Sequence, residues 1–294
     1  MDPRLPPSFT VGQARALGVP RRRVDAPDLT APFRGARATF VVDSTAARCR
    51  AYLVVAPNTF AFSHATAALL YGIPLPRRLE ASPVLHVSVP DGAAQPRRRG
   101  TIGHRGLETI VHQNGLPLVR PEVAWLQLAA VLTVDELVVA GDFLVRKKRP
   151  LSTLVRLAAA VEDAAGQRGV ERARSALREV RTLTESPRES WLRLTIVRGG
   201  LPEPVVGFTV YFQGAFVGTP DLAYEQARIA IEYEGAHHRT DKNTYEDDIA
   251  RREQFRRAGW LVLLVTDRML ARPSYVIAEV EALLRERGQP TRAH

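Results

Sequence analysis

Hydrophobic and polar positions are patterned most regularly in the last third of the chain. Ser186, Pro187 and Glu189 have the order of a helix N-terminus, and Gly199-Gly200 ends the apolar-periodic run that follows. Alternation then predicts strands over 205–212, 216–224 and 228–234, with a turn at Gln213-Gly214. A charged helix over 244–258, a fully buried strand over 260–265 and a last helix from Ser274 complete the pattern. This order of helix, three strands, helix, strand and helix predicts a mixed α/β domain.

The first fifty residues have a different pattern. Thr10 and Gly18 bracket a short helix, and a second helix is predicted from Pro20 through Val24. The stretch 33–40 has the composition of a wing hairpin. Two short helices around a glycine turn, the second one basic, predict a winged helix-turn-helix, although a small solvated helical hairpin fits the same spacing.

The middle of the chain alternates between helical and strand patterns. We predict a helix over 63–72, a strand over 85–89 and largely helical structure over 123–146, followed by a polar helical connector that Gly166 and Gly169 interrupt. The predicted division is a winged-helix domain (1–50), an accessory domain (51–149), a helical connector (150–185) and a C-terminal domain (186–294).

The charge is unevenly distributed. The chain has 294 residues with a net charge of +10; residues 186–294 carry 15 basic and 15 acidic side chains, and residues 1–185 therefore carry 26 and 16 of the totals of 41 and 31. An excess of positive charge confined to one part predicts a DNA partner there. The four arginines that we expect to contact DNA are Arg21, Arg22, Arg23 and Arg34.

Other features narrow the class of protein. Cys49 is the only cysteine, which excludes a disulfide framework and is typical of a reducing compartment. No apolar run approaches the roughly 18 residues that a membrane span needs, and the first residues lack a secretory signal. We therefore expect a cytoplasmic protein with no membrane partner. The loop Arg97–Arg99 is either a phosphate clamp or a solvated loop.

Acidic residues suggest a metal site. Glu232 and Glu234 are two apart in a predicted strand and share a face, and Asp221 follows Pro220 in the preceding predicted strand. Carboxylates about 4 Å apart repel by roughly 4 kcal/mol at an effective dielectric near 20, so grouping them is favourable when a cation lies between them. Oxygen ligands with retained water suit Mg²⁺ or Mn²⁺, and such an ion can polarise a phosphodiester.

This region, residues 186–290, resembles the restriction-endonuclease-like (PD-(D/E)xK) core, and more closely the very-short-patch-repair-like nucleases. The matching residues are Glu189, Pro220-Asp221, Glu232, Glu234-Gly235, His238, Asp248, Arg251, Phe255 and Gly259-Trp260. The resemblance implies an αβββαβ core and a divalent-metal-dependent DNA endonuclease. It implies that Asp221 and Glu232 hold the ion and Glu189 assists through water. Glu234 joins these as a catalytic candidate, and His237, Lys242, Asp248 and Arg251 as supporting or phosphate-contacting groups.

The sequence departs from the parent motif at one position. The motif has a lysine two residues after the second acid, where this chain has Glu234. Either Lys242 reaches back, or His237 or His238 transfers the protons, or the site is catalytically damaged. Histidine suits proton transfer because its unperturbed pKa is near 6.5.

The N-terminal part is similar to the winged-helix and accessory region of abortive-infection type IV antitoxins. The similarity rests on 9–19, Phe33-Arg34-Gly35 and 62–69. It implies DNA binding, a toxin or defence-system protein as a further partner, and an alternative function: a transcriptional regulator with an inactive nuclease fold. His64, His86, His104 and His112 are scattered without ligand spacing, so we expect them to be structural.

Overall fold

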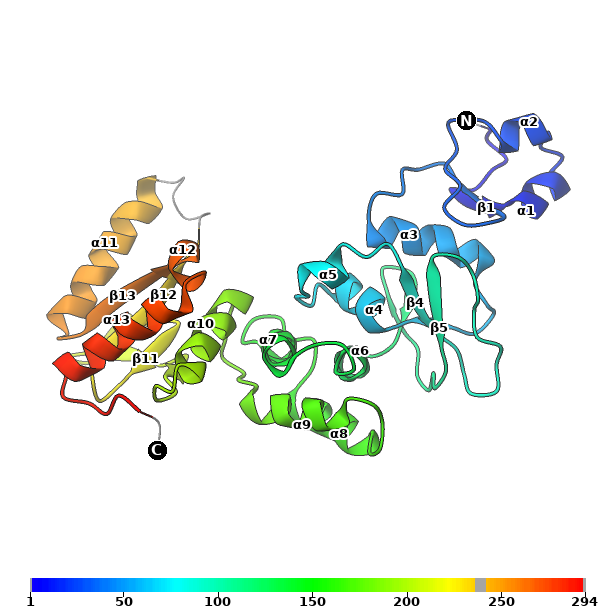
Figure 1. Cartoon of the computed structure of the whole chain (residues 1–294). Coiled ribbons are helices and arrows are strands. Elements are labelled where there is room, and N and C mark those ends of the chain that lie inside the picture. Colours follow the sequence, from blue (N-terminus) through cyan, green and yellow to red (C-terminus); the bar gives the residue numbers. More distant parts are fainter. Residues whose placement is uncertain (1, 236–241, 293–294) are drawn as a thin grey trace. The chain divides into compact units, whose positions relative to one another are not determined.

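The computed structural model describes residues 2–235 and 242–292, with the side chains of all of these except 242–249 (Figure 1). The chain has a mixed α/β fold in two compact units. Unit 1 comprises Met1–Leu137 and Val155–Arg174, and unit 2 comprises Val138–Leu154 and Ser175–His294. The chain passes from one unit to the other three times between residues 137 and 175. This division therefore differs from the four consecutive parts that the sequence predicts. No helix among the described residues is long and apolar enough to cross a membrane.

The chain begins with the two predicted short helices. The elements are β1 (Ser8–Thr10), α1 (Val11–Ala16), α2 (Arg21–Val24) and β2 (Ala36–Ala38). Thr10 and Gln13 form a reciprocal capping box at α1, and Gly18 has a φ of 70° where the chain turns. The predicted wing is organised differently: β2 pairs antiparallel with β1, which precedes α1, so stretch 33–40 supplies one strand of that sheet.

A five-stranded sheet forms the centre of unit 1, in the order β5-β4-β3-β7-β6. Its strands are β3 (Ala61–Phe62), β4 (Leu85–Ser88), β5 (Thr101–His104), β6 (Val111–Gln113) and β7 (Leu116–Leu118). The helices α3 (Thr45–Tyr52), α4 (His64–Tyr71) and α5 (Arg77–Glu80) accompany them, with a 3₁₀ turn at Leu53–Val55. Phe33 and Cys49 share one hydrophobic core with Phe62 and Leu85, so the predicted boundary at residue 50 lies inside a continuous core.

Four helices follow the sheet. They are α6 (Pro121–Leu128), α7 (Val134–Val145), α8 (Leu154–Asp163) and α9 (Val170–Glu179). The buried indole of Trp125 donates a hydrogen bond to the carbonyl of Leu137, which ties α6 to α7 at 2.8 Å. Gly169 has a φ of 90°, and a Cβ there would lie 2.6 Å from the backbone of Ala129, so glycine is required for this close approach.

Unit 2 contains a four-stranded sheet in the order β13-β12-β11-β8. The strands of this unit are β8 (Val205–Val206), β9 (Val210–Phe212), β10 (Ala215–Gly218), β11 (Leu222–Tyr224), β12 (Ile229–Glu234) and β13 (Leu261–Thr266). β9 and β10 form a separate hairpin around Gln213-Gly214, whose φ values of 51° and 80° fit a two-residue turn. The predicted long hairpin is therefore split between two sheets.

Helices cover both faces of this sheet. They are α10 (Pro187–Arg198), α11 (Lys242–Arg257), α12 (Asp267–Leu270) and α13 (Pro273–Glu286). Ile229 and Ile231 pack with residues of α10 and α13, whereas Ala230 packs with Phe255 of α11 and with Trp260. The alternation predicted along β12 thus places one set of side chains against each helical layer.

Three predictions for this unit change. β13 was predicted to be fully buried, but it pairs only with β12 at the edge of the sheet, and all but one of its residues are partly exposed. α13 begins at Pro273, one residue before the predicted start, because proline suits the first helical position. α11 begins at Lys242, before the predicted cap at Thr244.

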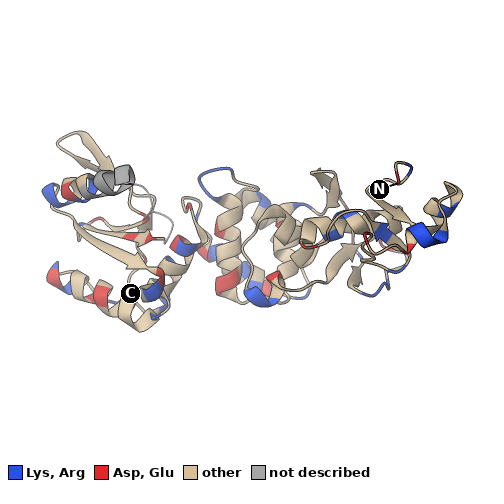
Figure 2. Ribbon diagram, turned by 90° about the horizontal axis from the view of Figure 1, so that it is seen from above, with Lys and Arg blue, Asp and Glu red and all other residues tan. Residues whose placement is uncertain are grey.

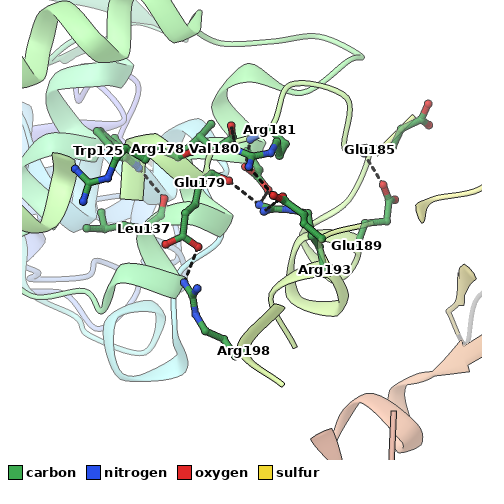
Figure 3. A network of polar contacts seen from close by, with 12 residues as sticks. Trp125, Leu137, Arg178, Glu179, Val180, Arg181, Glu185, Glu189, Arg193 and Arg198 are labelled. Carbon is green, nitrogen blue, oxygen red and sulfur yellow. Dashed lines mark hydrogen bonds and ion pairs between the residues drawn. The ribbon is translucent and has the colours of Figure 1, made fainter. Parts of the chain in front are cut away.

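A buried arginine joins several elements of unit 2 (Figure 3). Arg193 of α10 is 1% exposed; its guanidinium lies 3.0 Å from Asp142 of α7, 3.0 Å from Glu203, and donates to the carbonyl of Glu179 at 2.9 Å. Burial raises the pKa of Asp142, which Arg193 opposes. These contacts fix the helix that carries Glu189.

Candidate functional site

Antiparallel pairing between β11 and β12 brings two of the predicted metal ligands together. Leu222 pairs with Ile231 and Ala223 with Ala230, so Asp221 lies opposite Glu232, one position beyond the last registered pair. Directly opposed residues share a face and have Cβ atoms about 5 Å apart. The connecting turn spans 225–228 and is closed by the Arg228 N–H, which donates to the Glu225 carbonyl at 3.0 Å.

Asp221 is the most perturbed of these acids. Its Oδ2 accepts a hydrogen bond from the backbone N–H of Tyr233 at 2.7 Å. Burial, followed by the negative charges of Glu189 and Glu232, raises the pKa of Asp221 to about 7, while the Tyr233 N–H and Arg251 oppose the shift. Both Glu189 and Glu232 therefore act electrostatically on Asp221.

Glu189 reaches the site from the first turn of α10. The Ser186 Oγ accepts the Glu189 N–H at 3.3 Å, as expected for a helix cap. The Glu189 carboxylate, however, accepts the N–H of Glu185 at 2.8 Å (Figure 3), and the residue is 7% exposed. Burial is the main cause of its raised pKa. Glu189 is therefore a buried acid that keeps hydrogen bonds with Glu185 and Ser186 at the start of α10.

Two arginines of α11 face the acids of β12. Arg251 donates to Glu232 Oε1 at 2.5 Å and to the carbonyl of Thr219 at 3.2 Å. These contacts link α11 to β12 and to the segment that precedes Asp221. Arg252 lies 3.9 Å from Glu234. Glu234, at the position of the motif lysine, thus has a cationic neighbour from the helix.

Several predicted residues cannot be placed in this arrangement. His237 and His238 lie outside the described residues. Lys242 and Asp248 belong to α11, but their side chains are also outside the described part. The choice among these groups for proton transfer therefore stays a prediction.

The acids at the β11–β12 junction could hold a divalent cation such as Mg²⁺ or Mn²⁺ through their oxygens. Asp221 and Glu232 offer carboxylate oxygens on one face, and Glu189 is near enough to repel Asp221. Arg251 opposes the rise in the Asp221 pKa but does not cancel the effects of burial and of the two neighbouring acids. An ion that keeps several waters needs only one or two direct carboxylate ligands, which leaves Glu189 to act through water.

The predicted DNA-contacting arginines differ in their surroundings. Arg21 lies 3.5 Å from Asp25, and Arg23 makes a two-pronged ion pair with Asp28 at 2.7 and 2.8 Å. Arg22 is exposed on the single turn of α2. Arg23 is therefore engaged within the domain, whereas Arg22 projects into solvent.

Arg34 lies beside the basic loop Arg97–Arg99. Arg34, Arg97, Arg98 and Arg99 together line a cavity of about 570 Å³ in unit 1, and Arg98 donates to the Arg34 carbonyl at 2.6 Å. A Cβ on Gly103 would lie 2.7 Å from the Pro96 carbonyl oxygen, so glycine lets this loop lie against β5. Figure 2 marks the positions of Lys and Arg in blue and those of Asp and Glu in red along the ribbon. The structure thus joins two arginine groups that are far apart in sequence.

The sequence prediction missed a cluster of histidines. His64, His86 and His104, which we expected to be separate and structural, each offer a ring nitrogen within 4.8 Å of the other two. His112 is not part of this cluster. Their spacing carries no motif because they come from three different elements, and only the β4–β5 pairing brings His86 and His104 together.

Comparisons with known proteins give distant relatives. The chain is 24% identical over 216 residues to two uncharacterised proteins of Mycobacterium tuberculosis, from strains CDC 1551 and H37Rv, covering 73% of this chain and 78% of each relative. No family model matches. No solved structure matches either.

Proposed function

We propose that this chain is a divalent-metal-dependent DNA endonuclease whose acidic site lies at the β11–β12 junction. The observation that carries the proposal is the position of Asp221 opposite Glu232, together with a third carboxyl group, Glu189, that raises the pKa of Asp221. Acids held together in spite of their repulsion are typical of functional sites.

Each residue has a role that follows from its contacts. Asp221 and Glu232 hold the cation, and the backbone donor from Tyr233 orients Asp221. Glu189 positions water from its buried place on α10. Arg251 holds Glu232 and, because it is partly exposed, offers its remaining donors to a DNA phosphate. A bound divalent cation would supply Lewis-acid activation of the phosphodiester.

The arginine cavity of unit 1 supports a DNA substrate. Arg34 and Arg97–Arg99 present four guanidinium groups around one hollow, and guanidinium pairs well with phosphate. In this proposal, unit 1 binds DNA phosphates and unit 2 hydrolyses the phosphodiester.

A cleavage assay tests the proposal. Plasmid and single-stranded DNA are incubated with the full chain and Mg²⁺ or Mn²⁺. Asp221→Asn should reduce cleavage at least about 100-fold, because the ion contributes several kcal/mol of charge stabilisation. Glu253→Gln is the matched control: Glu253 is an acid of α11 that pairs with Arg256 and Arg257, and cleavage should persist. Wild-type protein that cleaves neither substrate with either metal contradicts the proposal.

One observation favours a second candidate, a DNA-binding regulator related in function to an antitoxin. Arg251 already neutralises Glu232, and Glu234 stands where the motif has lysine. In that case the chain would bind DNA and the metal would be dispensable. DNA binding without cleavage, equal in wild type and Asp221→Asn, would favour this candidate.

A further inference from the structure

Three elements of unit 1 bring three imidazoles together. His64 begins α4, His86 lies in β4 and His104 ends β5. β4 and β5 are parallel, with His86 opposite Ile102 and His104 opposite Ser88, so the two histidines are diagonal neighbours on one face. α4 brings His64 onto the same face.

The ring nitrogens have the separation of metal ligands. His86 Nδ1 and His104 Nε2 lie 3.0 Å apart, and one nitrogen from each of the three rings lies within 4.8 Å of the others. Tetrahedral ligands with metal–nitrogen bonds of 2.0–2.1 Å are about 3.3 Å apart. The His64 and His104 rings are stacked with centroids 3.7 Å apart, so coordination requires the planes of the rings to tilt away from this stacked arrangement.

Neighbouring groups prepare His64 for this role. The Ser63 Oγ lies 3.0 Å from His64 Nδ1, which leaves Nε2 for the cluster, and Gln127 accepts the His64 backbone N–H at 2.9 Å. His64 also has a φ of 49°, a left-handed conformation that a non-glycine residue keeps only when its surroundings hold it. Burial lowers the pKa of all three imidazoles.

The cluster opens on a cavity. His64 and His104 line a space of about 380 Å³ together with Gln127, Arg105 and Arg120, all from unit 1. A closed structural zinc site has four protein ligands, whereas three protein ligands beside a cavity leave a position for water or a small ligand.

We propose that His64, His86 and His104 bind one first-row transition-metal ion, with Zn²⁺ as the reference case, whose fourth position faces this cavity. Imidazole suits Zn²⁺, Cu²⁺ and Ni²⁺, whereas the carboxylates of unit 2 suit Mg²⁺ and Mn²⁺. The two sites therefore select different ions, and the histidine site does not depend on nuclease activity.

Metal uptake by the tag-free full chain tests the proposal. Equilibrium dialysis against micromolar Zn²⁺ should load one ion per chain, and the Co²⁺-loaded protein should show the ligand-field absorption of a tetrahedral site. The measurements use a His237→Ala/His238→Ala background, so that those two imidazoles cannot form a competing site.

Graded variants locate the ion. His86→Ala and His104→Ala should weaken uptake by more than about 100-fold. Ser63→Ala should weaken it by about 10–100-fold, the usual cost of losing a partner that orients a ligand. His112→Ala should match the background. Circular dichroism checks folding, and His104→Gln replaces any alanine variant that does not fold.

Two results would overturn the proposal. One is a background protein that takes up no Zn²⁺ under these conditions. The other is a folded His104→Ala or His104→Gln variant that binds Zn²⁺ as tightly as the background.

Discussion

Asp221 binds a proton more tightly in the folded chain than in the unfolded one. Its pKa rises from 3.8 to about 7 because of burial and the nearby charges of Glu189 and Glu232. A raised carboxyl pKa gives stability that is fully present below pH 3.8 and is lost as the pH rises toward 7. Above that range the ionised Asp221 lowers the free energy of unfolding by up to about 4 kcal/mol.

Asp221→Asn should therefore stabilise the protein in a pH-dependent way. The asparagine oxygen can still accept the Tyr233 N–H, but it carries no charge. In urea denaturation, the gain in the free energy of unfolding should grow between pH 5 and pH 7 and level off above pH 7.5. Added Mg²⁺ should stabilise the wild type at pH 8 and leave the variant unchanged. A gain that is the same at pH 5 and pH 8 would contradict this account.

At the scale of elements, the contact between α10 and α13 depends on one small residue. A Cβ on Gly199, at the end of α10, would lie 2.6 Å from Cγ1 of Ile277 on α13. The φ of Gly199 is −72°, so alanine fits its backbone and only the close approach opposes it.

Gly199→Ala should lower the free energy of unfolding by about 1–3 kcal/mol, the usual cost of overpacking. In an Ile277→Ala background the same change should cost much less, because the opposing side chain is absent. Chemical denaturation of the four proteins of this double-mutant cycle measures the coupling. Equal costs in both backgrounds would show that the contact is unimportant.

The sequence predicted helices and strands well where neighbouring residues form a helix cap or a regular alternation of hydrophobic and polar side chains. Ser186, Gly199 and the alternation of β12 gave α10 and β12, and the shared face of Glu232 and Glu234 followed from that period. The sequence could not show that β13 is an edge strand, because strand order depends on distant pairing. For the same reason it missed the cluster of His64, His86 and His104 and the hydrogen bond from Arg98 to the Arg34 carbonyl.

At the scale of the whole molecule, the excess charge belongs to residues 1–185. Several arginines there are held in internal ion pairs, as Arg23 is by Asp28. The cavity that Arg34 and Arg97–Arg99 line is therefore the part of this charge best placed for phosphate.

Arg97→Gln/Arg99→Gln should weaken DNA binding and reduce its dependence on salt. Each phosphate contact contributes about 0.9 to the slope of log affinity against log salt, so losing two should reduce the slope by up to about 2. Arg168→Gln/Arg174→Gln removes the same charge from positions of the same unit that do not line the cavity, and it should leave the slope nearly unchanged. Fluorescence anisotropy at several salt concentrations measures both. Equal slopes in the two double variants would exclude a special role for the cavity.

The short turn between β11 and β12 has a consequence for synthesis of the chain on the ribosome. It lets Asp221 and Glu232 meet as soon as this hairpin emerges, but Arg251 follows Glu232 by 19 residues. At about 5–20 residues per second that is a wait of roughly 1–4 s, whereas a hairpin forms within about 10 μs. The nascent hairpin therefore opens and closes many times while its acids lack their arginine. We expect cellular Mg²⁺ to neutralise the two acids during this interval. The ion would then assist folding of the nascent chain before it takes part in catalysis.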